Sequence, residues 1–197
     1  MKKYSLPILS VIIIAIAFFA FTRPPSKTIP HDQDETGEVT IGGTFTLTNQ
    51  NGKQVSDADF RGKLMLVYFG YTFCPDVCPG DLLTMTSALN TLGDDAKKIV
   101  PIFITVDPER DTVEQMHSYI ENFHPSFEAL TGTPEAIDAV AKKYKIYYAK
   151  VQDPGMTTYL MDHSAITYLM DGQGKYLMHF PHGTDAETMA KGLRKYL

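Results

Sequence analysis

The stretch LMLVYFGYTFCPDVCP, residues 64–79, decides the fold, because a strand pattern in it leads directly into a loop that holds both cysteines of the chain. Leu64–Gly70 is an uninterrupted apolar run that ends at a glycine, which is typical of a strand buried on both faces of a sheet. In open α/β sheets, functional sites gather at the carboxyl ends of such strands. The loop with Cys74 and Cys78 is therefore the first candidate for a functional site.

The segments around this stretch alternate between strand and helix patterns. Thr44–Thr48 alternates apolar and polar residues and is followed by the turn residues NQNG, which predicts a β-hairpin. DTVE at 111–114 fits a capping box, and Thr133 followed by Pro134 fits a helix start. Helices are predicted over 81–92, from 111 to about 123, from 133 to about 144 and from about 185 to 196, and strands over 99–106, 127–130, 145–151, 164–170 and 175–180. The segment QDPGMTTYLMD, residues 152–162, is predicted to be a loop.

This order of elements predicts an α/β fold with parallel central strands and an antiparallel C-terminal hairpin. A thioredoxin-like fold fits the order, with the first hairpin as an N-terminal β-hairpin extension. We expect this domain to occupy residues 38–197, which is long enough to bury one substantial core.

The N-terminus predicts a membrane anchor over residues 1–23. Leu6–Phe21 holds sixteen residues without a charge, with Lys2 and Lys3 before it and Arg23 after it. With its uncharged neighbours the run is within the ~17–25 residues that a spanning helix needs. A cleaved signal peptide is the less favoured alternative, because no cleavage site follows the run.

Residues 24–37, PPSKTIPHDQDETG, are rich in proline and polar residues and predict a flexible tether. Residues 1–30 hold four of the 18 basic residues and none of the 23 acidic ones, so the remainder carries a net charge of about −9. An acidic surface of this kind repels nucleic acid, so we expect no nucleic-acid partner.

The cysteine pair allows three interpretations. A structural disulfide closing so short a loop would stabilise the fold by only about 2 kcal/mol, which makes it the least favoured. A redox couple is plausible because Cys78 starts a helix, where a thiolate is stabilised. Against it, three residues separate the cysteines, and Asp76 adds a negative charge between them. A metal site is the third interpretation, and it requires a further ligand.

Six histidines are available to complete such a site. His163 is the favoured candidate, because MDHSAIT places it directly before a predicted central strand, in a loop able to cross the cysteine turn. The others are expected in the tether, within helices or on the surface: His31, His117, His124, His179 and His182. A site of two cysteines and one histidine is compatible with zinc and also with Cu(I).

Three separated motifs carry a resemblance to a known family: YFGYTFCPDVCP at 68–79, TVDPERDT at 105–112 and DHSAIT at 162–167. Together they make the chain from about Gly42 onward resemble the Sco/SenC family of copper chaperones. The resemblance implies a membrane-anchored thioredoxin-fold protein that binds copper, as Cu(I) or Cu(II), through Cys74, Cys78 and His163.

The resemblance also implies a task and a location. The family helps to mature the dinuclear copper site of cytochrome c oxidase subunit II, and a copper donor or a thiol reductant would be a further partner. The chain is then expected in the inner membrane as a single-pass protein with its domain on the outer side, in the periplasm or the intermembrane space. Cys74 and Cys78 would also be a redox pair. Alternatives are a thiol-disulfide oxidoreductase, a thiol peroxidase, or a copper or redox sensor.

Other residues near these motifs receive a structural interpretation. In DPERD, Asp107 follows a predicted strand, and Arg110 with Asp111 is expected to form a turn and a helix cap. The aromatic and thioether side chains near the site are expected to pack in the core or under loops: Tyr68, Tyr71, Met156 and Met161.

Overall fold

The computed structural model describes residues 40–152, 154–155 and 157–197. The predicted anchor (1–23) and tether (24–37) lie outside the described residues, as do His31 and Met156. Within the described part of the chain, no helix combines the length and the apolar character needed to cross a membrane.

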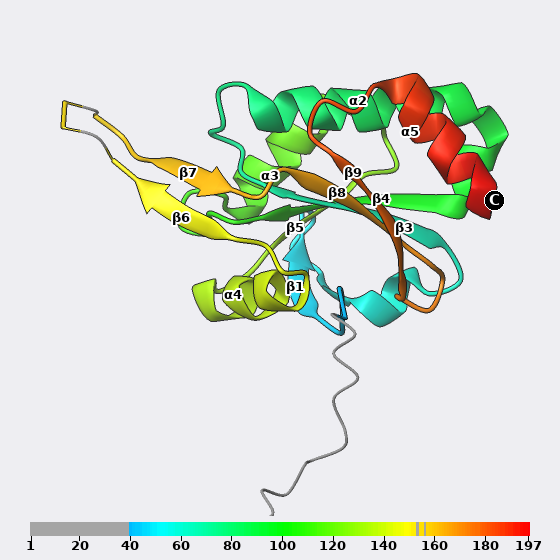
Figure 1. Ribbon diagram of the computed structural model, residues 1–197. Helices are drawn as coiled ribbons and strands as arrows, with labels where there is room; N and C mark the ends of the chain where they lie inside the picture. The colour runs from blue at the N-terminus through cyan, green and yellow to red at the C-terminus, as the bar shows by residue number, and fades with distance from the viewer. Residues whose placement is uncertain (1–39, 153, 156) are drawn as a thin grey trace, which may run out of the picture. The chain divides into compact units, whose positions relative to one another are not determined.

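Seven strands form one mixed sheet with the order β2-β1-β5-β4-β3-β8-β9 (Figure 1). The central strands β5, β4 and β3 run parallel, and the remaining pairs of neighbours are antiparallel. The strands are β1 Thr46–Asn49, β2 Gln54–Ser56, β3 Leu64–Gly70, β4 Ile99–Thr105, β5 Glu128–Thr131, β8 Ile166–Met170 and β9 Tyr176–Pro181. The predicted parallel centre and the two hairpins are confirmed.

Helices cover both faces of this sheet. Figure 1 shows α2 and α5 side by side on one face and α4 on the opposite face. The α-helices are α2 Val77–Leu92, α3 Val113–Ile120, α4 Pro134–Lys143 and α5 Ala186–Leu193, and short 3₁₀ helices span Asp57–Phe60, Gly93–Lys98 and Arg194–Tyr196. The four predicted helices are therefore present, although α2 begins four residues earlier than expected and α3 ends three residues earlier.

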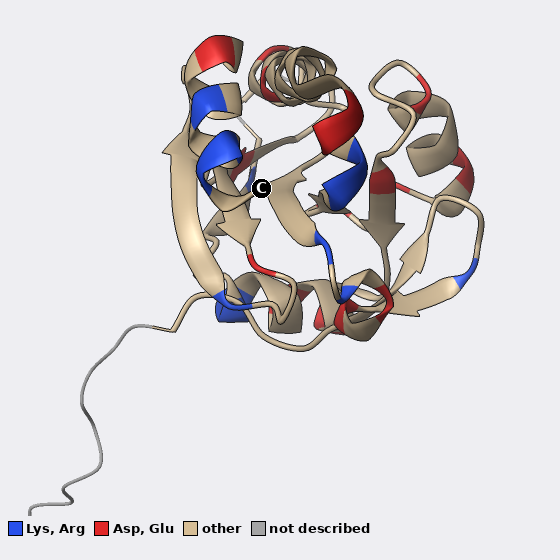
Figure 2. Ribbon diagram, turned by 90° about the vertical axis from the view of Figure 1, so that its right-hand side faces the viewer, with Lys and Arg blue, Asp and Glu red and all other residues tan. Residues whose placement is uncertain are grey.

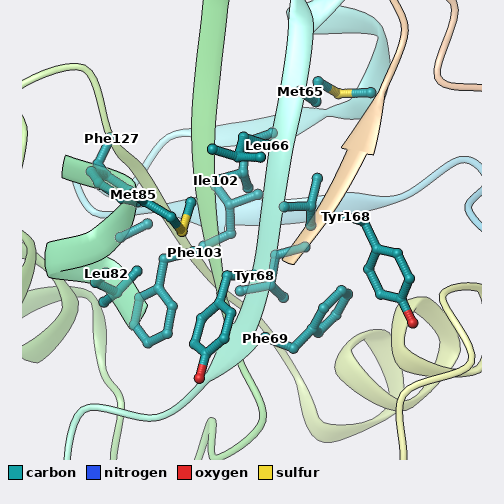
Figure 3. Close-up of a cluster of buried hydrophobic side chains, with 14 of the residues drawn as sticks. Met65, Leu66, Tyr68, Phe69, Leu82, Met85, Ile102, Phe103, Phe127 and Tyr168 are labelled. Atoms are coloured by element: carbon teal, nitrogen blue, oxygen red, sulfur yellow. The ribbon is translucent and has the colours of Figure 1, made fainter. Parts of the chain in front are cut away.

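Strand β3 is the centre of the core, and all seven of its residues are buried. Successive side chains of a strand point to opposite faces. Tyr68 lies with Phe103 and Leu82 on the α2 side, whereas Phe69 packs against Tyr144 with ring centres 5.3 Å apart (Figure 3). The continuous apolar run thus reflects burial on both faces, as predicted.

A hairpin of which only the first strand was predicted, over 145–151, stands apart from the main sheet. β6 (Tyr148–Val151) pairs antiparallel with β7 (Leu160–His163) as a separate two-stranded sheet (Figure 1). The loop predicted over 152–162 was wrong in its last three residues, which belong to β7. Pairing with β6 and burial of Met161 stabilise this strand, and neither is visible in its mixed sequence pattern.

The helix cap predicted at Asp111 was also wrong. Helix α3 begins at Val113, and its cap is Thr112, whose side-chain oxygen accepts a hydrogen bond from the Gln115 backbone N–H. Asp111 is instead buried, with no exposed surface. A fully buried carboxylate needs several hydrogen-bond donors, so its partners lie inside the domain.

The Asp111 carboxylate fixes the start of the cysteine loop. It accepts hydrogen bonds from the backbone N–H and hydroxyl of Thr72, at 3.0 and 2.6 Å, and from the Thr105 hydroxyl at 2.6 Å. Burial raises the pKa of Asp111, while these hydrogen bonds act in the opposite direction. One carboxylate therefore joins the ends of β3 and β4 at the edge of the sheet where the cysteines follow.

We expect Asp111→Ala to lower the free energy of unfolding by at least about 2 kcal/mol, because three buried donors lose their acceptor at roughly 1–3 kcal/mol each. Urea unfolding of the variant measures this loss. Asp95→Ala is the control, because Asp95 makes an exposed ion pair with Lys98 that is worth little. Equal unfolding midpoints for the two variants would contradict the role given to Asp111.

Candidate metal centre

Cys74 and Cys78 lie where the chain passes from β3 into α2. The helix begins at Val77, so Cys74 belongs to the loop and Cys78 to the first turn. The Cys78 backbone N–H donates to Sγ of Cys74 over 3.3 Å. Because N–H groups of a first turn have no acceptor within the helix, the Cys74 sulfur takes the place of a capping oxygen. Neither cysteine forms a disulfide.

Gly70 allows Cys78 to lie against the end of β3. A Cβ added at Gly70 would stand 2.9 Å from Sγ of Cys78 and 2.9 Å from the Tyr68 ring, which is too close for either contact. Both of these neighbours are fully buried and have no room to move. Glycine is therefore required at the last position of β3.

His163 reaches the cysteines because β8 is antiparallel to β3. Tyr68 near the end of β3 pairs with Thr167 near the start of β8. The residues that precede β8 therefore lie at the same edge of the sheet as the residues that follow β3. His163 is the last residue of β7 and stands three residues before β8. The prediction that His163 lies in a loop was wrong, whereas its predicted place before the strand β8 is confirmed.

The structure brings all three predicted ligand side chains together. Their donor atoms, two sulfurs and a ring nitrogen, lie within 4.8 Å of one another. Nε2 of His163 is 3.3 Å from Sγ of Cys78. Nδ1 of His163 is 3.3 Å from the Ser164 carbonyl oxygen, which can only accept, so Nδ1 carries the proton and Nε2 presents its lone pair. This tautomer is the one that a metal-binding imidazole needs.

Two tyrosine rings hold the imidazole from the sides. The rings of Tyr68 and Tyr71 stand nearly perpendicular to that of His163, with centres 6.2 and 6.0 Å from it. Both tyrosines are buried, as is Met161, so the predicted packing role of these three residues is confirmed. The packing restricts the ring orientation of His163.

The two thiols have opposite pKa shifts. Hydrogen bonds from the Cys78 side chain and from the backbone N–H groups of Cys78 and Asp76 lower the pKa of Cys74 to about 3. The hydrogen bond to Cys74 and burial raise the pKa of Cys78. Asp76 thus favours a thiolate through its backbone N–H, contrary to the effect expected from its carboxylate. The opposite shifts make Cys74 the preferred thiolate of the pair and Cys78 its hydrogen-bond donor.

A groove of about 310 Å³ opens beside the three donor atoms. Cys74 and His163 line it, whereas Cys78 lies beneath the surface. Asp76 and Asp162 also line it, and no lysine or arginine is among its described lining residues. The groove therefore favours the approach of a cation. Figure 2 looks at the other end of the domain, where the C-terminus lies, and there basic residues occur in small groups among acidic ones.

The remaining histidines have other contacts. His117 pairs with Glu121, His124 with Ser126 and His179 with Tyr176, all on the surface as expected. His182 is exposed as well, but it lines the same groove as His163.

His182 was not recognised as a site residue from the sequence. Its Nδ1 lies 2.9 Å from the carboxylate of Asp81 on α2. The strand register is the signal that locates it, because Pro181 pairs with Ile166 at the start of β8, close to His163. A larger cavity of about 800 Å³ lies at the other end of β3 and β4 and contains none of the three donor residues.

The motif DPERD also lies next to the site. Asp107 is buried and forms an ion pair with Arg110, and Arg110 contacts Tyr159 of the segment that leads into β7. These contacts agree with the structural role expected for Asp107 and Arg110. The two residues do more than form a turn, because they also join the loop after β4 to the segment before β7.

In reduced, metal-free protein we expect alkylation of Cys74 by iodoacetamide to keep a constant rate between about pH 8 and pH 5. The thiolate persists down to its lowered pKa, whereas an ordinary thiol loses about tenfold in rate per pH unit below its pKa. Peptide mass spectrometry follows the modification.

Cys78→Ala is the control for this measurement, because it removes the main hydrogen bond that lowers the pKa of Cys74. In that variant the rate should become dependent on pH. A tenfold fall per pH unit already in the unaltered chain would contradict the lowered pKa of Cys74.

Comparison with known proteins gives the family. A family model described as SCO1/SenC matches residues 33–197. Protein SCO1 homolog 1, mitochondrial, of Arabidopsis thaliana is 39% identical over 160 residues, which are 81% of this chain but 48% of that protein. The SCO2-like protein of Rickettsia prowazekii is 46% identical over 144 residues, 73% of this chain and 70% of that protein.

A solved structure agrees with these relatives. Bradyrhizobium japonicum ScoI with copper bound is 45% identical, with a TM-score of 0.74 over 80% of this chain and 99% of that one. The chain thus spans about half the length of the Arabidopsis relative but nearly all of the solved ScoI chain. With these matches in sequence and fold, the chain belongs to the SCO1/SenC family.

Proposed function

We propose that this chain is a copper metallochaperone that binds one copper ion through Cys74, Cys78 and His163. The observation that carries the proposal is the meeting of two sulfurs and one imidazole nitrogen within 4.8 Å of one another. Likeness to a ScoI that holds copper supports the choice of metal.

The donor set itself favours copper. Thiolates are soft ligands that select Cu(I) or zinc, and a neutral imidazole suits copper in either oxidation state. Zinc in a structural site takes four protein ligands, whereas this site offers three. A soft ion with three donors keeps one side open, and here that side faces the groove lined by Cys74 and His163. An ion held in this way is accessible to ligands from another protein.

The proposed acceptor is subunit II of cytochrome c oxidase, and the proposed task is maturation of its dinuclear copper site. Membership of the SCO1/SenC family supports this acceptor. The charge of the groove fits the cargo, because Asp76 and Asp162 attract a cation toward the sulfurs.

The proposed location is the inner membrane, on whose outer side the copper site of the oxidase lies. Residues 1–23 would anchor the chain, residues 24–37 would be the tether, and residues 38–197 would form the exported domain, in the periplasm or the intermembrane space. The length of the uncharged run Leu6–Phe21 supports the anchor.

Protease added to intact membranes tests this location. We expect the domain to be digested from the outer side while a short N-terminal fragment stays with the membrane. Full protection until the membrane is broken would contradict the orientation. Recovery of the undigested domain in the soluble fraction would contradict the anchor.

A second function is supported by the unequal pKa values of the two thiols. The half-exposed Cys74 thiolate can attack a disulfide of a partner and displace one partner thiolate. Cys78 then loses its proton and attacks the Cys74 sulfur, which releases the second partner thiolate and leaves a Cys74–Cys78 disulfide. The chain would thereby reduce its acceptor by two electrons. A copper or redox sensor would use the same residues.

Reduced full-length chain titrated with Cu(I) against a chelator of moderate affinity should bind about one ion per chain. We expect His163→Ala to lower the affinity by roughly 10–100-fold, because the two sulfurs alone leave the ion short of a ligand. His179→Ala is the control, since His179 lies on the surface and contacts Tyr176. The absorbance of the chelator measures how much Cu(I) the chain has taken from it.

Two results would contradict the copper carrier. Full affinity in His163→Ala would remove the histidine from the site. Rapid turnover of a disulfide or peroxide substrate that persists in His163→Ala, together with weak copper binding, would favour the oxidoreductase.

A further inference from the structure

His163 lies on a hairpin whose strands are not paired with the main sheet. Among the described strands, β6 and β7 pair only with each other and not with the seven-stranded sheet. Backbone pairing therefore fixes β3 and β8 relative to each other but does not join the hairpin to the main sheet. The position of His163 depends on the side chains that join this hairpin to the rest of the domain.

Several of these links are made by Arg110, which lies between β4 and α3. Its Nε donates to the Asp107 carboxylate, and its Nη1 donates to the Tyr159 carbonyl at 3.0 Å and the Thr158 hydroxyl at 3.2 Å. The Tyr159 hydroxyl in turn donates to the other Asp107 oxygen at 2.8 Å. Asp107, Arg110 and Tyr159 thus form a closed ring of contacts, which we call the Arg110 clamp.

The guanidinium of Arg110 also packs against aromatic rings of the cysteine loop and of the segment that leads into β7. Its central carbon is 3.7 Å from the centre of the Tyr159 ring, 4.8 Å from that of Phe73 and 5.8 Å from that of Tyr71. Phe73 and Tyr71 belong to the cysteine loop, whereas Tyr159 leads into β7. A planar cation that stacks and donates hydrogen bonds at its edge can join these segments, and lysine cannot do both.

The clamp reaches His163 by two short routes. Tyr159 is followed directly by the four residues of β7, of which His163 is the last. Tyr71 contacts the guanidinium and also packs against the His163 ring at 6.0 Å. The ion pair of Lys150 on β6 with Glu109 adds a third link to the same loop. The position of the imidazole relative to the cysteines thus follows the position of the hairpin.

We propose that the Arg110 clamp is a positioning device that holds the β6–β7 hairpin against the cysteine loop and thereby keeps His163 in reach of a copper ion bound by Cys74 and Cys78. The proposal rests on the copper-binding function proposed above. Arg110, Asp107 and Tyr159 contact none of the ligand atoms and act through His163. When the clamp is open, the cysteines still bind copper, but the histidine is lost from the ion.

Arg110→Lys tests the clamp, because lysine keeps the charge near Asp107 but loses the stacking and the bonds to Tyr159. We expect the affinity of the full chain for Cu(I) to fall about tenfold or more, toward that of His163→Ala. In the double variant Arg110→Lys/His163→Ala we expect no further loss, because both changes remove the same ligand. When the Arg110→Lys variant is loaded with Cu(II), its electron paramagnetic resonance spectrum should lack the coupling to the His163 nitrogen that the unaltered chain shows.

Arg61→Lys is the matched control, because Arg61 also joins an aspartate, Asp57, to a backbone carbonyl, that of Gln173, but at the other end of β3. It should leave copper affinity and nitrogen coupling unchanged. Tyr159→Phe removes only the hydroxyl bond to Asp107 and should give a smaller loss. If Arg110→Lys fails to fold, the copper affinity of Tyr159→Phe tests the clamp in its place, and unchanged affinity would contradict the clamp.

Two results would contradict the clamp but not the copper-binding function. One is unchanged affinity and nitrogen coupling in both Arg110→Lys and Tyr159→Phe. The other is a double variant whose loss of affinity equals the sum of the losses from Arg110→Lys and His163→Ala. Full affinity in the single variant His163→Ala would have a different meaning. It would contradict the ligand set of the proposed function, and the clamp with it.

Discussion

The antiparallel pairing of β8 with β3 is the constraint on which the site depends. The cysteines follow β3, and His163 precedes β8, so these residues meet only if the two strands are neighbours and run in opposite directions. The pairing is strongly fixed because both strands are buried, and a shift by one residue would turn their apolar side chains to the wrong face. The core of the domain therefore sets the position of a site that lies at its surface.

Around this constraint the domain adds smaller devices that refine the geometry. Gly70 lets the first turn of α2 approach β3, and the buried Asp111 carboxylate holds Thr72 at the start of the loop. Neither residue touches the three donor atoms through its own side chain. Their effect is to keep the two sulfurs and the imidazole close while the site has no ion to hold it together.

Much of the fold could be predicted from the sequence because its elements have strong local patterns. The apolar run of β3, the stripe of α2 and the turn residues of both hairpins each identify an element without reference to the rest of the chain. Strand β7 has no such pattern, since its stability comes from pairing with β6 and from burial of Met161. The cap of α3 was misplaced for a related reason, because Asp111 is a good capping residue by type but is used inside the domain.

The site could be predicted in part. The cysteine pair follows from ligand chemistry, and His163 follows from its place before β8 together with the resemblance to the Sco/SenC family. The contacts of His182 with Asp81 and of Arg110 with Tyr159 join residues 101 and 49 positions apart. Such contacts depend on strand register and on the angle of a hairpin, and a single sequence contains no local pattern for either.

The unequal exposure of the two sulfurs gives ligand exchange at this site a direction. Cys78 has no exposed surface, whereas Cys74 and His163 face the groove. A donor atom from an approaching protein therefore meets Cys74 and the imidazole first, and the buried sulfur is the last to be replaced. If copper is bound as proposed, we expect it to leave the site in steps that begin at Cys74 and His163, the two donors that solvent reaches.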